Sequence, residues 1–261
     1  MREMFTEIVH YRHLLYMLTL RDIKLRYKET VMGFFWAIFM PMLIVIAGVM
    51  VKVAFSKFSG QPVGFQELAS VTVKALPWSF FISSIRFSTT SLLGNSNLVT
   101  KIYFPREVFP IASTLANLYD FFIASVPVGI LLVVMGLPAH WSQLWLPLLL
   151  AILFLFTIGA GLFLSCASLF FRDVKYIVDI IVTFAIFFTP VFYEASMFGK
   201  WSNVIMLNPV GAILESINAV LVLGHSPSAF WVAYSALWAV GGLLLSWSIF
   251  HKAEFLFAER I

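Results

Sequence analysis

Six apolar stretches, each long enough to cross a bilayer as a helix, constrain the fold of this chain more than any other feature. A helix needs about 20 apolar residues to cross the hydrocarbon layer, and each stretch carries at most one charged residue. They are residues 31–51, 75–97, 108–137, 144–171, 176–193 and 226–250. The sequence therefore predicts an all-α integral membrane protein with six transmembrane helices, in a single domain that covers residues 1–261.

The composition supports lipid as the solvent of much of the surface. Hydrophobic residues make up 61% of the chain and charged residues only 11%, whereas about a quarter of an average soluble domain is charged. The apolar excess is larger than one core can hold, so much of it must face lipid. With one cysteine there is no disulfide framework, and we interpret Cys166 as a small packing residue.

Residues 204–224 are long enough to cross the membrane but contain several residues that interrupt an apolar helix, namely Asn208, Pro209, Gly211, Glu215 and Asn218. Broken backbone at membrane depth survives only where protein or a water-filled cavity satisfies its polar groups. We therefore predict re-entrant helices between spans five and six, directed towards a pathway.

The distribution of lysine and arginine indicates the orientation, because cytoplasmic loops are enriched in both. With a cytoplasmic N-terminus and six crossings, twelve of the lysine and arginine residues lie on the cytoplasmic side: Arg2, Arg12, Arg21, Lys24, Arg26, Lys28, Lys101, Arg106, Arg172, Lys175, Lys252 and Arg260. Four lie outside: Lys52, Lys57, Lys74 and Lys200. The sequence therefore predicts that both termini are cytoplasmic, and a seventh crossing would weaken this bias.

Residues 5–29 predict an amphipathic helix on the cytoplasmic leaflet. Leu20, Ile23 and Tyr27 recur at helical spacing, and cations repeat that spacing one residue on. Such a helix buries its apolar stripe in the interface while its cations meet anionic headgroups. It is either a topological anchor alone or also a surface that contacts a cytoplasmic partner.

The second span is unusually polar. One narrow arc of it carries Ser79, Ser83, Arg86, Thr90, Gly94 and Asn97. An ionisable residue in a membrane helix usually faces the bundle interior or a wet cavity and has a partner. Asp120 lies at a depth that matches Arg86, so we hypothesise an ion pair between them; the alternative is that each snorkels or meets a different helix.

Small and aromatic residues at helical spacing suggest two further packing features. Spans four and six carry small residues that permit close backbone approach, within the chain or between subunits: Gly159, Gly161 and Ser165, and Gly241, Gly242 and Ser246. Span five carries an aromatic stripe that faces lipid or neighbouring helices, or else lines a conduit suited to sugar faces: Phe184, Phe187, Phe188 and Phe192.

Motifs of catalysis are absent from the sequence. There is no phosphate-binding G-x-x-x-x-G-K-[ST] loop, no H-E-x-x-H and no G-x-S-x-G. The histidines are scattered among presumed loops and interfaces. We therefore expect no catalytic, cofactor or metal site on this chain, and no ATP hydrolysis by the chain alone.

The segment between spans two and three, NSNLVTKIYFPREVFP at residues 95–110, predicts a stiff docking surface. Pro105 and Pro110 rigidify it, and its charged side chains stand beside aromatic ones, which suits a groove on a partner. The segment resembles the K-x-x-F-P-R loop of ABC-2-type exporter permeases that move polysaccharides such as O-antigen and teichoic acid. Further matches follow in the same order: RDIKLRYKETVMGFFWA at 21–37, FFRDVKYI at 170–177, then FFTPVFY and LNPV.

The resemblance implies a homodimer bound to two cytoplasmic ATPase subunits, which bind ATP and Mg, with a channel between the protomers. The family's coupling helix corresponds to residues 97–107, with Asn97, Lys101, Tyr103, Phe104, Pro105, Arg106 and Glu107 as coupling residues. Its gate corresponds to residues 194–223, with Asn208, Pro209 and Glu215. Replacing Phe104 or Arg106 by Ala is then expected to uncouple ATP hydrolysis from export.

In this family a lipid-linked glycan would reach the channel laterally, near the cytoplasmic interface of the bacterial inner membrane. Its pyrophosphate could meet Arg21, Arg26 and Lys28, although these could equally be ordinary topology-setting cations. The channel or bundle interior is expected to contain Ser83, Arg86, Thr90, Asp120, Phe184 and Phe188. Membrane lipids are further partners, and nucleic acid is not expected.

Three other functions compete with polysaccharide export. The nearest is an ABC-2 permease for a drug, haem or lipid, which shares the six-span plan. A membrane-embedded glycan or acyl transferase usually needs clustered His, Asp or Glu at the interface, whereas Asp120 and Asp179 lie far apart in sequence. A passive channel would need no ATPase, so co-purification of a nucleotide-binding subunit separates the transporters from the other two.

Overall fold

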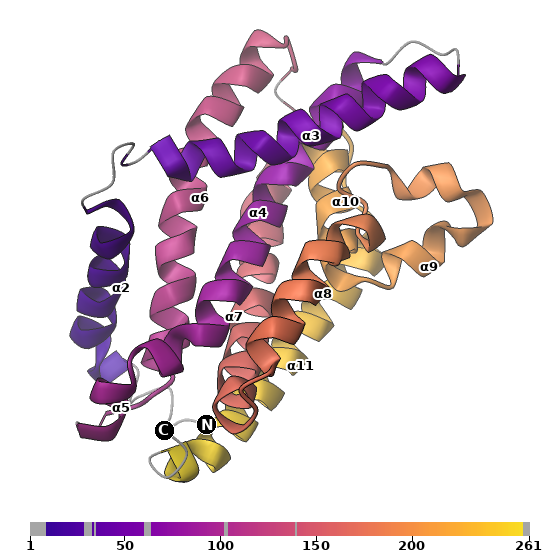
Figure 1. Cartoon of the computed structure of the whole chain (residues 1–261). Coiled ribbons are helices and arrows are strands. Elements are labelled where there is room, and N and C mark those ends of the chain that lie inside the picture. Colours follow the sequence, from indigo (N-terminus) through magenta and orange to yellow (C-terminus); the bar gives the residue numbers. More distant parts are fainter. Residues whose placement is uncertain are drawn as a thin grey trace.

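The computed structural model describes residues 9–28, 33, 35–59, 64–101, 104–138 and 140–257. Within these residues every regular element is a helix (Figure 1), which confirms the predicted all-α class. The long helices are α3 (Phe35–Ser59), α4 (Phe65–Gly94), α6 (Val108–Val134), α7 (Leu146–Phe170) and α11 (Ala229–Ala253). The shorter α-helices are α2 (Arg12–Tyr27), α5 (Ser96–Lys101), α8 (Val174–Phe188), α9 (Ser202–Met206) and α10 (Pro209–Leu221). Three 3-10 helices complete the set: η1 (Trp141–Trp145), η2 (Ala195–Trp201) and η3 (Glu254–Leu256).

Five helices of the described part are long and apolar enough to cross a membrane, so the chain is an integral membrane protein. They are Phe35–Phe58, Phe65–Gly94, Val108–Val134, Trp141–Phe170 and Ala229–Leu256. The predicted span 176–193 corresponds to α8, which has 15 residues and is therefore about 23 Å long. It ends because Pro190 pushes Thr189 out of the helical region, to φ −113 and ψ 136. A sixth crossing and re-entrant helices remain predictions.

Two helices extend beyond the apolar stretches that predicted them. Helix α3 continues eight residues past Val51, and Lys52 within it pairs with Glu67 of α4 at 3.3 Å. Helix α4 begins at Phe65 rather than residue 75, so Lys74 lies inside a helix and is fully buried. The apolar run that predicted this span begins after Lys74, whereas the helix includes it, because a cation stays within a helix when a partner compensates its charge.

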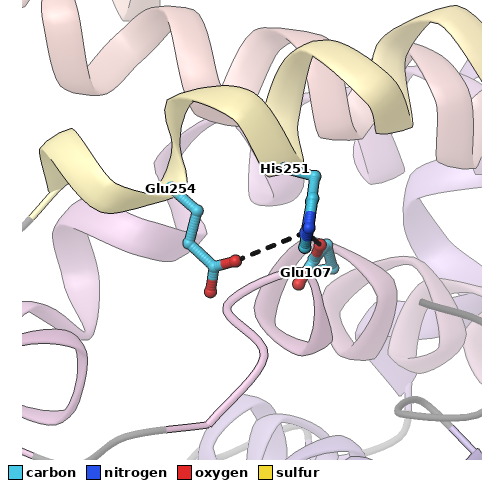
Figure 2. Close-up of side chains that lie close together, drawn as sticks. All are labelled: Glu107, His251 and Glu254. Atoms are coloured by element: carbon cyan, nitrogen blue, oxygen red, sulfur yellow. Dashed lines mark ion pairs between the residues drawn. The ribbon is translucent and has the colours of Figure 1, made fainter. Parts of the chain in front are cut away.

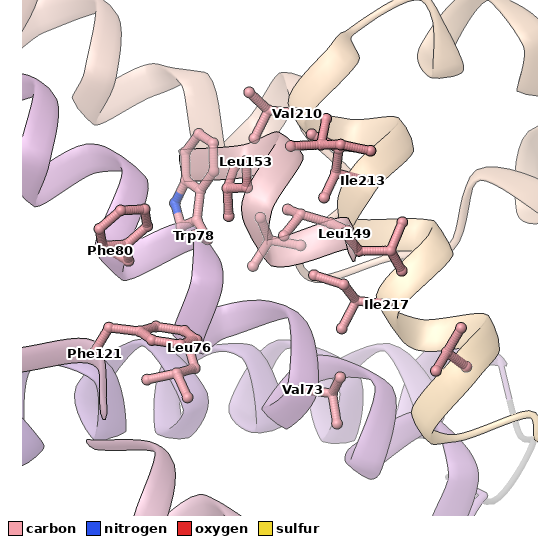
Figure 3. Close-up of a cluster of buried hydrophobic side chains, with 14 of the residues drawn as sticks. Val73, Leu76, Trp78, Phe80, Phe121, Leu149, Leu153, Val210, Ile213 and Ile217 are labelled. Atoms are coloured by element: carbon pink, nitrogen blue, oxygen red, sulfur yellow. The ribbon is translucent and has the colours of Figure 1, made fainter. Parts of the chain in front are cut away.

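Helix α4 is the centre of the bundle, where it contacts α3, α6, α7, α8 and α10. Figure 3 shows its core. Trp78 of α4 faces Leu149 and Leu153 of α7, and Ile213 and Ile217 of α10 pack against the other side of α7. Each of these five side chains is at most 2% exposed. Because lipid is as apolar as these side chains, such close van der Waals packing, rather than escape from a polar solvent, stabilises the bundle.

Small residues bring α7 close to two neighbouring helices. A Cβ atom at Gly159 would lie 2.9 Å from the backbone of Leu243 in α11, and one at Gly161 would lie 2.9 Å from Ser88 Cβ in α4. Packing within the chain thus accounts for these two glycines. Gly241 has nothing within 4 Å of its Cβ position in the described structure.

Helix α2 lies along α6 and is shorter than the predicted interface helix. Tyr11, at φ −88 and ψ 18, precedes its first residue, and residues 5–8 and 29 lie outside the described part. Its Leu18 is 6% exposed and joins a second core cluster with Phe250 and Phe257. One side of α2 therefore faces protein, while Met17 and Leu25 are exposed.

Candidate functional site

A cavity of about 600 Å³ opens between α2, α3, α4, α6 and α8. Four of the predicted interior residues meet around it: Ser83, Arg86 and Thr90 of α4, and Asp120 of α6. Arg26 and Tyr27 of α2 and Asp179 of α8 complete its charged and polar wall, and Trp36, Phe80 and Phe87 are among its aromatic residues. Ser79 also lines the cavity, so the part of the polar arc from Ser79 to Thr90 faces one space between the helices, whereas Gly94 and Asn97 do not line it.

The charged residues of the cavity pair across helices, but not in the predicted combination. Arg86 Nε lies 3.2 Å from Asp179 Oδ1, and Arg86 Nη2 donates to Thr183 Oγ1 at 2.9 Å. Asp120 instead pairs with α2. The Arg86–Asp120 pair was therefore wrong, because matched depth does not decide which neighbouring helix offers the nearer partner.

Arg26 and Tyr27 fasten the end of α2 to the cavity wall. Arg26 Nη1 donates to Asp120 Oδ2 at 2.6 Å and to Asn117 Oδ1 at 2.9 Å, and its guanidinium lies 4.0 Å from the centre of the Phe87 ring. The Tyr27 hydroxyl donates to the other Asp120 oxygen. Burial, and next this hydrogen bond, raise the pKa of Tyr27 above its ordinary value.

The other two cations proposed for a lipid headgroup do not line the cavity. Arg21 pairs with its neighbour Asp22 at 2.8 Å, and Asp22 also accepts from Ser113 of α6. Lys28 is exposed at the end of α2. Of the three, Arg26 is the one placed where a ligand inside the bundle could reach it.

A second hollow, of about 420 Å³, lies along α8 and ends at Asn208. Phe184 and Phe188 line it, but in the single chain they are 57% and 76% exposed. They are therefore on the outside of this bundle rather than in its interior.

Each of the residues predicted for a gate makes hydrogen bonds to neighbouring residues or segments. Asn208 caps α10 by accepting from Val210 N at 3.1 Å, and its amide donates to Thr189 Oγ1 at 2.9 Å. The Pro209 carbonyl accepts from Ser235 of α11. Glu215 accepts from Ala195 N at 3.1 Å and pairs with Lys74 at 3.3 Å. Lys74 also donates to the carbonyl of Tyr193 at 2.7 Å, so one buried cation of α4 holds both α10 and the chain before η2.

The predicted coupling residues divide into exposed and buried groups. Asn97 is exposed on α5, whereas Phe104 is 6% exposed within the second core cluster. Arg106, after Pro105, bonds to Glu254 at the end of α11, and Glu107 is 3% exposed. The Lys101 side chain and Tyr103 lie outside the described residues. Phe104 and Arg106 therefore face the chain itself, which the sequence alone did not indicate.

One group of side chains in the described ranges has a composition that can hold a metal ion. Glu107, His251 and Glu254 offer ligand atoms within 4.8 Å of one another (Figure 2). His251 Nδ1 lies 3.7 Å from a carboxylate oxygen of each glutamate. The contacts of His251 with both glutamates account for the arrangement of the three side chains.

Sequence reasoning missed several residues that the structure places at these sites. Asn117 lies one turn before Asp120 on the same helix face, a spacing that could have identified it. Lys74 stands in the apolar run SVTVKALPWSFF, which is a signal of burial. His251 and Glu254 stand three residues apart, but their contacts with Glu107 and Arg106 had no local signal, because those partners lie far away in sequence.

In the described part, five membrane-length helices and a polar cavity between helices are typical of the membrane-embedded part of a transport protein. Residues 13–222 match the ABC-2 type transporter family, and the chain belongs to that family. This confirms the resemblance found in the sequence. The chain is thus a permease, the membrane subunit of a transporter, and the family implies a partner ATPase subunit.

The chain is similar over nearly its whole length to permeases named for O-antigen export. It is 28% identical over 254 residues to the O-antigen export system permease protein RfbA of Klebsiella pneumoniae, which covers 94% of both chains. It is 29% identical over 262 residues to the protein of the same name from Myxococcus xanthus, which covers 98% of both.

Proposed function

We propose that this chain is the channel-forming subunit of an ATP-driven exporter that moves a lipid-linked polysaccharide from the cytoplasmic side across the inner membrane. The observation that carries the proposal is the likeness to two O-antigen export permeases over 94% to 98% of each chain. Likeness at both ends of the chain means that the loop, the gate segment and the cavity helices are all included.

The proposed assembly is a homodimer with two nucleotide-binding subunits, which bind ATP and Mg. Exposed apolar side chains on α3 and α8 support a partner surface beyond lipid alone: Trp36, Met40, Leu43, Phe184, Phe187 and Phe188. In the dimer the aromatic hollow along α8 lines the channel between protomers. Flat rings there suit the apolar faces of sugar units.

The proposed orientation places the α4–α6 loop, the α7–α8 turn and the end of α11 in the cytoplasm, together with both termini. Figure 1 shows these three segments at the same end of the bundle. They carry Arg106, Arg172, Lys175 and Lys252, and such an excess of cations is typical of cytoplasmic loops. The motor then reaches the loop at residues 97–107.

The cavity is the proposed site where the carrier lipid's headgroup is held before transport. Its wall joins a guanidinium, Arg26, to hydroxyl and aromatic side chains, which suits an anionic phosphate next to a sugar. Arg26 is held by Asp120, so a phosphate that binds there competes with this carboxylate and loosens α2 from α6. Arg21 and Lys28 act as outlying cations that concentrate the anionic headgroup at the surface.

Mass spectrometry of the complex purified from native membranes tests the proposal. We expect a nucleotide-binding subunit in equal amount and a retained glycolipid whose quantity falls in Arg26→Gln. Arg172→Gln, on the turn outside the cavity, is the matched control and should leave the glycolipid unchanged. Recovery of an ATPase with only a drug, haem or simple lipid would show that the substrate is not a lipid-linked polysaccharide. Recovery of the chain without any ATPase would contradict the proposal that it belongs to an ATP-driven exporter.

A further inference from the structure

We propose that the C-terminal end of α11, with η3 and Phe257, clasps the coupling loop and fixes its position, and that Glu254 is the positioning residue. The proposal rests on the proposed function, in which residues 97–107 receive the motor. It assigns a task to a segment that the sequence marks only as a cytoplasmic tail. Three sets of contacts carry it.

The first set is between Glu254 and Arg106. The Glu254 carboxylate accepts from Arg106 N at 3.2 Å, and its backbone carbonyl accepts from the Arg106 guanidinium. The same guanidinium reaches back to the carbonyl of Val99 at 3.4 Å. Arg106 thus joins both sides of the loop to the end of α11. Glu254 holds Arg106 both by its side-chain carboxylate and by its backbone carbonyl.

The second set is the cluster in Figure 2, in which His251 of α11 stands between two carboxylates. Its Nδ1 lies 3.7 Å from Glu107 on the loop side and 3.7 Å from Glu254 on its own helix. Glu107 is 3% exposed, so its carboxylate is buried where it meets α11. His251 therefore adds a second link between α11 and the residue that precedes α6.

The third set is aromatic. Phe257 is fully buried, with its ring centroid 5.1 Å from Phe250 and 6.1 Å from Phe170. The Arg106 guanidinium lies 5.8 Å from the centre of the Phe257 ring. Phe104 and Phe109 belong to the same cluster, 5.4 Å apart. The tail thus contributes a core residue of the cluster from which the loop projects.

Together these contacts mean that the loop is already held in place before the motor binds, because its inner side contacts the end of α11. Phe104 and Arg106 hold the loop, while Asn97 on the outer side is exposed and available to a partner. A push on the loop passes through Arg106 and Glu254 into α11. A loop released from the tail would still bind the motor but would transmit less of its motion.

Two deletions of the full-length chain in complex with its ATPase test the clasp. Deletion of residues 254–261 removes Glu254 and Phe257, whereas deletion of residues 258–261 is the matched control that keeps both. We expect the longer deletion to lower the amount exported per ATP hydrolysed by about tenfold or more, because it removes at least one charge-assisted hydrogen bond together with a buried aromatic residue. The shorter deletion should preserve the coupling. Equal loss in both deletions would overturn the proposal.

Point variants keep the test valid if the longer deletion does not fold. Glu254→Ala removes the acceptor for Arg106 N and the partner of His251, whereas Glu254→Gln keeps an acceptor oxygen. We expect Glu254→Ala to uncouple and Glu254→Gln to recover most of the export. A spin label at Asn97, in a Cys166→Ala background, reports the mobility of the loop without the motor.

The label separates the clasp from the proposed function. A more mobile label in Glu254→Ala than in Glu254→Gln, with export lost, supports both. A more mobile label with unchanged export supports the clasp but contradicts the coupling role of the loop. An immobile label in Glu254→Ala overturns the clasp, whatever happens to export.

Discussion

Asp120 on α6 accepts a hydrogen bond from Arg26 on α2 at 2.6 Å, and the two residues are separated by 94 positions in the sequence. Their side chains are 21% and 16% exposed, so both are largely removed from solvent. Asp120 also accepts from Tyr27. The link closes one wall of the cavity and decides how firmly the interface helix is attached to the bundle.

Replacing Asp120 by Asn is expected to destabilise the protein by about 1–3 kcal/mol, because a charge-assisted hydrogen bond is lost inside the bundle. Reversible unfolding in mixed micelles measures the free energy. In a double-mutant cycle with Arg26→Gln, the second change should cost much less in the presence of the first. Fully additive effects would show that the two side chains do not interact.

Tyr27 gives stability a dependence on alkaline pH. Its pKa in the folded protein lies above the ordinary 10.0, so the unfolded chain releases its proton first. This contribution to stability is complete below pH 10 and is lost as pH rises further, because the folded state holds the proton more tightly than the unfolded chain. We expect Tyr27→Phe to reduce this pH dependence in unfolding experiments. Tyr16→Phe, at an exposed position of the same helix, should retain it, and equal slopes in both variants would contradict the assignment.

Much of the architecture could be predicted from apolar runs, but helix ends could not be read from them. Lys52 and Lys74 interrupt the hydropathy without interrupting α3 or α4, because Glu67 and Glu215 compensate their charges. Pro190 ends α8 within an apolar run. Hydropathy reports solvent preference, whereas backbone sterics and local charge compensation decide where a helix stops.

The candidate sites were predicted as residues more successfully than as contacts. Helical spacing alone identified Ser83, Arg86 and Thr90 of α4 as residues of one helix face, because a membrane helix usually turns its polar side chains away from lipid. The partner of Arg86 required knowledge of which face of α8 approaches it, and no spacing within one helix contains that information. For the same reason, the contact between Arg106 and Glu254 was not predictable.

The buried pair of Lys74 and Glu215 is expected to be sensitive to loss of one partner. Glu215→Gln keeps an acceptor for Ala195 N but leaves Lys74 uncompensated, which should cost about 3–5 kcal/mol. Adding Lys74→Met should recover part of that loss, since the double variant buries no charge. Unfolding in mixed micelles measures both.

Lys52 and Glu67 form the matched control for this pair, at the same 3.3 Å. Glu67 is 40% exposed, whereas Glu215 is 16% exposed. Lys52 is 7% exposed, but solvent reaches and screens the Glu67 carboxylate, so Glu67→Gln should cost less than Glu215→Gln. A similar loss in Glu67→Gln and Glu215→Gln would refute the importance of burial.

Gly159 is expected to tolerate no side chain. Gly159→Ala would bring a Cβ atom to 2.9 Å from the Leu243 backbone, so α7 and α11 must separate, at about 1–3 kcal/mol. Gly241→Ala, with nothing within 4 Å of the new atom in the described structure, should be neutral or stabilising by up to about 1 kcal/mol. Thermal denaturation of the two purified variants compares them, and equal melting temperatures would contradict close contact at Gly159.

Helix α11 is anchored near both of its ends to segments that are far apart in the bundle. Near its first turn, Tyr234 donates to the Leu207 carbonyl and Ser235 to the Pro209 carbonyl, while at its far end Glu254 holds Arg106. Its 25 residues contain no proline and span about 37 Å. Because α11 is one continuous helix that contacts both segments, we expect a displacement of the loop to be passed on to the start of α10.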